Sequence, residues 1–212
     1  MSKRVLYIKK LTMLALSVSL YIISGLYIKI NIPPVPFSTL TLFCMLSAML
    51  LGKYLAPLSV LIYIGMGLSG LPIFAKGIGG PMYVLEPSFG YLIGFVISGF
   101  VVGLLTEKIA DNRVIINEKL DLETSKFKKL LIRFRYSALT KRFFASILGL
   151  LIVYVCGVVY FVLIQQFYFG SGVDLGKVMV SFVLIFIPSD LMWCVLASLI
   201  AGKILKALRL NV

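Results

Sequence analysis

Residues Leu71 to Gly94 read LPIFAKGIGGPMYVLEPSFGYLIG and interrupt the apolar pattern of the chain. Glycine and proline are dense within this Gly/Pro stretch, at positions Gly77, Gly79, Gly80, Gly90, Gly94, Pro72, Pro81 and Pro87. Because glycine loosens the backbone and proline removes a backbone donor, a helix cannot continue through this composition. The stretch is either an ordinary connecting loop or the lid and wall of a small-molecule site. The flanking sequence favours the second interpretation.

The composition is that of an integral membrane protein. Of the 212 residues, 60% are hydrophobic and 14% are charged, and the mean hydropathy is +1.05. Soluble domains are about half apolar and about a quarter charged. No segment outside the apolar runs is long enough to bury a core of its own. We therefore predict an all-α integral membrane protein in which residues 1–212 form a single membrane domain.

Six apolar runs are candidates for transmembrane helices, each of which needs about 20 apolar residues to cross a bilayer. The runs are Leu11–Ile28, Leu40–Leu51, Tyr54–Leu68, Phe89–Leu105, Phe143–Ile164 and one contained within Val178–Leu205. The second run is short, and only Gly52 and Lys53 separate it from the third. The prediction is a bundle of six transmembrane helices.

The distribution of lysine and arginine predicts how these helices are oriented. If the N-terminus is inside the cell, all of the 21 basic residues except Lys29, Lys76 and Lys177 fall on the inner side. Positive residues concentrate on the cytoplasmic side of membrane proteins, so both termini are predicted to be cytoplasmic. This asymmetry and the anionic lipid of the bilayer account for the net charge of +13, and no nucleic-acid partner is predicted.

Residues 106–142 form a long cytoplasmic connector in this topology. Apolar residues recur there at helical spacing, at Phe127, Leu130, Leu131, Phe134 and Ala138, and lysine and arginine surround them. The pattern predicts a basic amphipathic helix that lies on the inner membrane surface. Contact with a partner subunit is the alternative interpretation.

Three irregular segments fall on the outer side. They are Lys29–Thr39 (KINIPPVPFST), the Gly/Pro stretch and the region before Pro188. Proline restricts both its own backbone and that of the preceding residue, so the first segment is held extended. Convergence of the three segments predicts a binding site that is open to the outside.

Asp190 is the acidic residue that falls within an apolar run, IFIPSDLMWCVLASL. An acid at mid-membrane is costly and is a candidate for a functional site. If Pro188 begins the last helix, Asp190 lies in its first turn, where the helix dipole also favours a carboxylate. We favour a ligand contact over this purely structural role. Trp193, one turn along the same face, offers a flat apolar surface to a ligand or an anchor at the lipid interface.

Further candidates lie in and beside the Gly/Pro stretch. Glu86 is either a solvated loop charge or a polar contact with a ligand or with Lys76. Four aromatic residues could line an apolar pocket there: Tyr91, Tyr83, Phe74 and Phe37. For any one of these rings, packing is the alternative to ligand contact.

Ala15 and Ser19 lie four residues apart on the first helix. Small residues at this spacing let another helix approach closely, so this face is a candidate for docking a partner. Packing within the chain is the alternative.

Enzymatic, metal and channel functions are not favoured. The chain has no histidine, and its three cysteines stand alone in apolar runs, so neither a metal site, a cofactor nor a catalytic dyad is predicted. The runs also lack the polar or charged rings of a channel.

The outer motifs resemble those of the biotin-transporter (BioY-type) family, the substrate-capture (S) components of energy-coupling factor (ECF) transporters. The motifs occur in the family's order over nearly the whole chain, except for the 106–142 connector, which is longer than the family's usual link. They are PPVPF at 33–37, LLG at 50–52, GLPIFAKGIGG at 70–80, EPSFGYLIGF at 86–95 and IPSDL at 187–191.

The resemblance implies a six-helix protein of the prokaryotic cell membrane that binds biotin from the outside. Such proteins work with a transmembrane coupling subunit and two ATP-binding cassette ATPases. Gly90, Tyr91 and Asp190 match family binding-site residues, and Ala15 and Ser19 lie near the face that meets the coupling subunit. The chain has no phosphate-binding loop of its own, so ATP hydrolysis must come from another chain.

Several positions depart from the family pattern. Trp193 stands where the family has lysine, Glu86 and Phe89 replace two glycines of the turn, and Leu40 replaces a glutamine. These changes alter the shape and the charge of the pocket together. An S component of the same fold that binds another vitamin or cofactor precursor is therefore the alternative.

Overall fold

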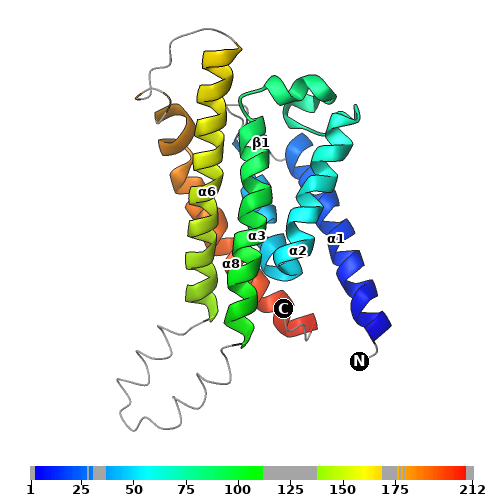
Figure 1. Ribbon diagram of the computed structural model, residues 1–212. Coiled ribbons are helices and arrows are strands. Elements are labelled where there is room, and N and C mark those ends of the chain that lie inside the picture. Colours follow the sequence, from blue (N-terminus) through cyan, green and yellow to red (C-terminus); the bar gives the residue numbers. More distant parts are fainter. Residues whose placement is uncertain are drawn as a thin grey trace, which may run out of the picture.

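The computed structural model describes residues 3–27, 29–30, 37–111, 138–168, 176, 178 and 180–208. The proline run at 31–36 and segment 112–137, which contains the predicted amphipathic helix except for Ala138, lie outside the described residues. Within these ranges the fold is a bundle of helices, as predicted (Figure 1). The helices are α1 (Lys3–Leu26), α2 (Leu40–Leu68), α3 (Phe89–Asp111), α6 (Ala138–Phe167) and α8 (Ile187–Leu208).

Five helices of the described part are long and apolar enough to cross a membrane. The N-terminus and the C-terminus lie at the same end of the bundle, and the turns of the Gly/Pro stretch lie at the other (Figure 1). Two-residue strands β1 (Lys29–Ile30) and β2 (Phe37–Ser38) pair antiparallel between α1 and α2. The remaining elements are the 3-10 turns η1 (Ala75–Gly77) and η2 (Pro81–Leu85) and a π-helical turn η3 (Val180–Leu184).

The helix α2 contains two of the predicted runs and doubles back between them. Gly52 has φ 77° and ψ −174°, a conformation outside the helical region that glycine adopts without a steric cost. In an unbroken helix Ser47 and Ser59 would lie roughly 18 Å apart. The Tyr21 hydroxyl nevertheless contacts both, forming a hydrogen bond with Ser47 and lying 3.0 Å from the Ser59 Oγ. The chain therefore folds back at Gly52.

Residues of α3 contact the turn at Gly52 and hold the reversed chain in place. The Glu107 carboxylate accepts a hydrogen bond from the Lys53 backbone N–H over 3.1 Å and lies 3.3 Å from the Lys53 ammonium. A Cβ on Gly103 would lie 2.6 Å from the Lys53 nitrogen, so only glycine lets α3 approach the turn this closely. On its other side α3 packs on α6, where a Cβ on Gly94 would lie 2.8 Å from Val153.

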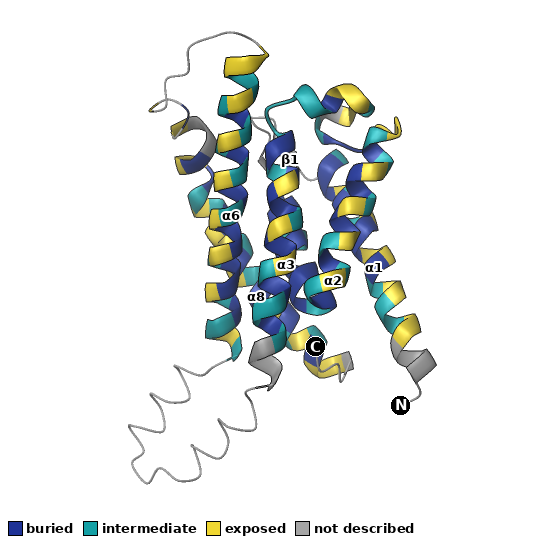
Figure 2. Ribbon diagram, viewed as in Figure 1, coloured by how far each residue is buried: buried dark blue, intermediate teal, exposed yellow. Residues whose placement is uncertain are grey.

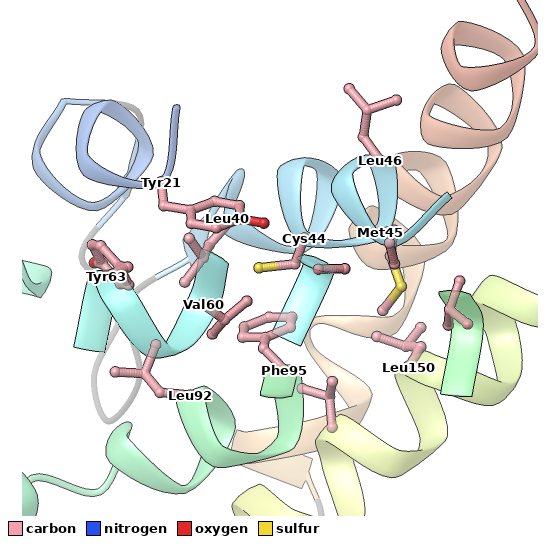
Figure 3. Close-up of a cluster of buried hydrophobic side chains, with 14 of the residues drawn as sticks. Tyr21, Leu40, Cys44, Met45, Leu46, Val60, Tyr63, Leu92, Phe95 and Leu150 are labelled. Atoms are coloured by element: carbon pink, nitrogen blue, oxygen red, sulfur yellow. The ribbon is translucent and has the colours of Figure 1, made fainter. Parts of the chain in front are cut away.

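The core lies between α2, α3, α6 and α8, and α1 lies at the edge. Figure 3 shows side chains from several helices meeting in one cluster, among them Tyr21, Val60, Phe95 and Leu150. In the apolar stretch of α1 that could cross a membrane, 22% of the residues are buried, compared with 56% in the corresponding stretch of α3. Figure 2 shows exposed residues along α1. The helix α1 therefore leaves a wide apolar face uncovered.

Candidate functional site

The Gly/Pro stretch is pinned to the bundle. Phe74 packs directly against the backbone of Gly67 on α2, where a Cβ would collide with the ring. The Gly80 N–H donates to the Gly67 carbonyl over 2.8 Å, and Gly80 itself has a positive φ of 100°. The starts of the η1 and η2 turns are thus both tied to the C-terminal end of α2. The stretch is therefore packed against the bundle, and its role as the lid and wall of a small-molecule site stays a prediction.

A row of aromatic rings links this stretch to α1, α2 and α6, and we call it the aromatic row. Successive rings are 6.0, 5.5, 4.2, 6.4 and 5.8 Å apart between centroids, and they belong to Tyr21, Tyr63, Phe74, Tyr83, Phe89 and Tyr160. Most pairs meet edge to face, which aromatic rings favour, whereas Phe74 and Tyr83 stack. Phe74 and Tyr83 are buried within the row. The observed contacts therefore give these two predicted pocket residues a packing role.

Polar contacts fasten the far end of the stretch. The Tyr83 and Ser88 hydroxyl groups lie 2.9 Å apart, and the Tyr160 hydroxyl donates to the Val84 carbonyl. Burial raises the pKa of the Tyr83 phenol above its ordinary value, and the nearby Glu86 carboxylate raises it further, so the hydroxyl stays protonated. Glu86 is half-buried at the end of η2. Its predicted contact with Lys76 lies outside the description, because the Lys76 side chain is not described.

Asp190 lies in the first turn of α8, as expected, but it is buried, with 8% of its surface exposed. Tyr154 of α6 donates its hydroxyl hydrogen to Asp190 Oδ2 over 2.6 Å. The Thr41 side chain of α2 is also close enough to interact with the carboxylate. A buried carboxylate requires such donors, because burial without them is costly. Asp190 is therefore more than a solvated acid at a helix start.

Tyr91 of α3 lies beside this carboxylate. Its ring meets the Tyr154 ring edge-on, at 6.5 Å and 88°, and it lies close enough to Asp190 for an electrostatic interaction. Gly157 makes room for the ring, because a Cβ there would lie 2.7 to 2.9 Å from three Tyr91 ring carbons. Asp190, Tyr154, Tyr91 and Thr41 form what we call the acid cluster, to which α8, α6, α3 and α2 each contribute one residue.

Trp193 lies one turn along α8 from Asp190 and is half-buried. Its indole Nε1 is buried and has no hydrogen-bond partner among the described residues. Buried N–H groups in native proteins nearly always have a partner, so an orphaned one calls for an explanation. A ligand acceptor at this position would supply the missing partner.

The other predicted site residues are less informative. Gly90 is buried at the start of α3, where a Cβ would collide with Tyr160 and lie 3.1 Å from the Cys156 carbonyl oxygen. Close packing of α3 on α6 thus accounts for this glycine, and a ligand contact stays a prediction. Phe37 pairs with Ile30 in the two-stranded ribbon, and its side chain is not described.

Tyr154 was not predicted from the sequence, although two signals pointed to it. A tyrosine in the middle of an apolar run needs a hydrogen-bond partner for its hydroxyl. Asp190, an acid in another run, needs a donor. Pairing the two would have identified the contact, but nothing in the sequence shows that these positions lie at the same depth.

The predicted partner-facing residues lie on the uncovered face of α1. Ala15 and Ser19 are both exposed, and the Ser19 hydroxyl donates to the Ala15 carbonyl of its own helix over 3.0 Å. Large apolar side chains, including Leu16 and Ile23, share this exposure. The face is thus apolar and contains small residues at which another helix could approach.

Comparison with known proteins agrees with this architecture. A family model described as the BioY family matches residues 1–210. A crystal structure of the S-component for biotin from an ECF-type ABC transporter superposes with a TM-score of 0.65 and 25% identity, covering 97% of this chain and 95% of that one. A probable biotin transporter BioY of Pyrococcus horikoshii is 29% identical over 196 residues, which are 92% of this chain and 96% of the relative.

Two shorter matches are more similar. A probable biotin transporter BioY of Lysinibacillus sphaericus is 47% identical over 85 residues, 40% of this chain and 43% of the relative. The biotin transporter BioY of Thermotoga maritima is 45% identical over 87 residues, 41% of this chain and 52% of the relative. In these two matches the chain covers about half of the length of each relative. Because the family model covers nearly the whole sequence, the chain belongs to the BioY family.

Proposed function

We propose that this chain is the substrate-specific S component of an ECF vitamin importer and that it binds biotin from outside the cell. The observation that carries the proposal is the acid cluster, in which a buried carboxylate is held by side chains from several helices. The names of the relatives and of the superposed structure support biotin as the ligand. The chain binds and delivers its ligand without converting it chemically.

The proposed topology has six passes through a prokaryotic plasma membrane, with both termini in the cytoplasm. The reversal at Gly52 supports two passes within α2. The shared end of the two termini and the positions of the basic residues support the orientation. The Gly/Pro stretch then lies on the outer side, where the ligand arrives.

In the proposed binding mode, the ligand enters between the predicted outer segment Lys29–Thr39 and the Gly/Pro stretch. Asp190 accepts hydrogen bonds from ligand N–H groups such as those of the biotin ureido ring. Tyr91 and Trp193 pack against the ligand, and the indole N–H of Trp193 meets a ligand acceptor. Gly90, Glu86 and Phe37 complete the outer side of the site.

The proposed partners are a transmembrane coupling subunit and two ATP-binding cassette ATPases. The uncovered face of α1, with Ala15 and Ser19, is where the coupling subunit would dock. Close approach of two helices at small residues is the usual basis of such contacts in membranes. ATP hydrolysis by the partner ATPases would reorient the loaded protein.

Trp193 favours one alternative, an S component for another vitamin or cofactor precursor. Trp193 provides a neutral donor and an aromatic face where the family pattern has a cation, so the electrostatics at this position differ. A ligand that places an acceptor, rather than an anion, near Trp193 would suit the site better.

Titration calorimetry of biotin against the detergent-purified protein tests the proposal. We expect one-to-one binding that is lost in Asp190→Ala, because the cluster then has no acceptor for the ligand N–H groups. Glu107→Gln, at the opposite end of the bundle, is the matched control and should bind as the unmodified protein does. Absence of binding by folded, unmodified protein would exclude biotin, and the same sample would then be titrated with other vitamins.

A further inference from the structure

The Tyr154 hydroxyl ties α6 to the Asp190 carboxylate on α8. Its O–H donates to Oδ2 over 2.6 Å, and the two side chains are 7% and 8% exposed. Hydrogen bonds to an ionised carboxylate are shorter and stronger than those between neutral groups. Because water has little access to the pair, this bond, together with the nearby Thr41 side chain, determines where the carboxylate points.

The Tyr154 ring is held independently of Asp190. Tyr91 meets it edge-on at 88°, and the Tyr91 ring is itself seated over Gly157, one turn along α6 from Tyr154. A Cβ at Gly157 would approach the Tyr91 ring carbons to within 2.7 Å, so the ring rests directly on the α6 backbone. Packing therefore fixes the phenol before any ligand arrives, and the hydroxyl is a preset donor.

We propose that Tyr154 is a positioning residue of the binding site: it orients the Asp190 carboxylate toward the ligand without contacting the ligand itself. This inference rests on the proposed function for the identity of the ligand, but the contact between Tyr154 and Asp190 can be tested in ligand-free protein. A carboxylate can accept about four hydrogen bonds, and Tyr154 supplies one of them. Capacity remains on the same group for ligand N–H donors, which then meet an acceptor that is already oriented.

A double-mutant cycle separates positioning from direct contact. The variants Tyr154→Phe, Asp190→Asn and their combination are titrated with biotin. Tyr154→Phe keeps the ring that packs on Tyr91 and removes only the donor. We expect its affinity to fall roughly 10- to 100-fold, the usual effect of losing a hydrogen bond to a charged group. In the Asp190→Asn background the same change should cost little more, because no carboxylate is left to orient.

Tyr21→Phe is the matched control. It also removes a buried tyrosine hydroxyl that bonds to side chains, but these belong to Ser47 and Ser59 on α2. A general loss of stability would weaken binding in both variants, whereas positioning weakens it in Tyr154→Phe alone. Equal affinity of Tyr154→Phe and the unmodified protein would overturn the inference. Losses that add in full across the cycle would also overturn it, since they indicate that Tyr154 contacts the ligand directly.

Infrared spectroscopy of the ligand-free protein provides the second readout. The chain has only 8 aspartate and glutamate residues, so the Asp190 band can be identified by subtracting the Asp190→Asn spectrum. We expect Tyr154→Phe to shift this band and Tyr21→Phe to leave it in place. If the unmodified protein does not bind biotin, the proposed function fails, and this readout still decides the inference. A band that Tyr154→Phe leaves unshifted overturns it.

Discussion

The Asp190 carboxylate lies where a charge is costly, and its neighbours explain why it is tolerated. Ionised groups are rarely buried without donors, and the Tyr154 hydroxyl at 2.6 Å supplies one. Tyr154 depends on Tyr91 for its placement, and Tyr91 depends on the bare backbone at Gly157. Gly157, which does not contact Asp190, therefore helps to position the carboxylate through the two tyrosine rings.

Gly157→Ala tests this dependence. The added Cβ would lie 2.7 to 2.9 Å from the Tyr91 ring, and the edge-on Tyr154 ring limits how far Tyr91 can move. Overpacking of this kind costs about 1–3 kcal/mol, more than the roughly 0.5–1 kcal/mol that alanine gains over glycine within a helix. We expect a lower melting temperature in detergent and weaker biotin binding.

Gly65→Ala is the control for Gly157→Ala, because a Cβ at Gly65 would meet nothing within 4 Å. This variant gains the helical preference of alanine without the collision. Similar melting temperatures for the two variants would show that the Tyr91 ring moves aside freely, contrary to the packing described above.

At the scale of elements, α2 shows what local sequence can and cannot predict. The division into Leu40–Leu51 and Tyr54–Leu68 was visible in the sequence, because Gly52 and Lys53 interrupt the apolar pattern. The partners of the turn were not visible, because Glu107 and Gly103 lie on α3, far along the chain. In the same way charge and motif, which are local signals, single out Asp190 and Tyr91 as predicted site residues, and the structure brings the two together. The contact between Tyr154 and Asp190 is not visible in the sequence, since it joins two separate helices.

Gly52→Ala should damage the α2 reversal more than loss of the ion pair beside it does. At φ 77° and ψ −174° an L-residue is strained, which costs of order 1–3 kcal/mol. By contrast, the Lys53–Glu107 ion pair is about 30% exposed on both sides, and exposed pairs contribute about 0–1 kcal/mol. We expect Gly52→Ala to lower the melting temperature clearly and Glu107→Gln to lower it slightly. The reverse order would show that the ion pair, and not the glycine, maintains the turn.

At the scale of the whole molecule, the bundle separates a closed core from an open α1 face. The acid cluster lies between α2, α3, α6 and α8, whereas α1 leaves Ala15 and Ser19 uncovered. Ligand capture and partner docking, as proposed, would therefore use different surfaces of one molecule. A substitution on the exposed face of α1 can then impair partner docking without impairing ligand capture.

Labelling of introduced cysteines tests the proposed orientation of the whole molecule. Met82, in the Gly/Pro stretch, and Tyr54, beside the Gly52 turn, are 71% and 72% exposed, so they form a matched pair. In intact cells, a membrane-impermeant thiol reagent should label Met82→Cys and not Tyr54→Cys. Both should be labelled after the cells are opened. The unmodified protein reports any reaction of its own cysteines, and labelling of Tyr54→Cys in intact cells would contradict the orientation.

The composition of the acid cluster also bears on how the protein is made. Tyr91 and Tyr154 lie on helices that leave the ribosome before α8, which carries Asp190. Until α8 is inserted beside them, the Tyr154 hydroxyl lacks its acceptor, and the site lacks the charge that we propose recognises the ligand. Nascent chains that have not yet synthesised α8 are thus incompetent for capture, and the ligand cannot help the earlier helices to assemble.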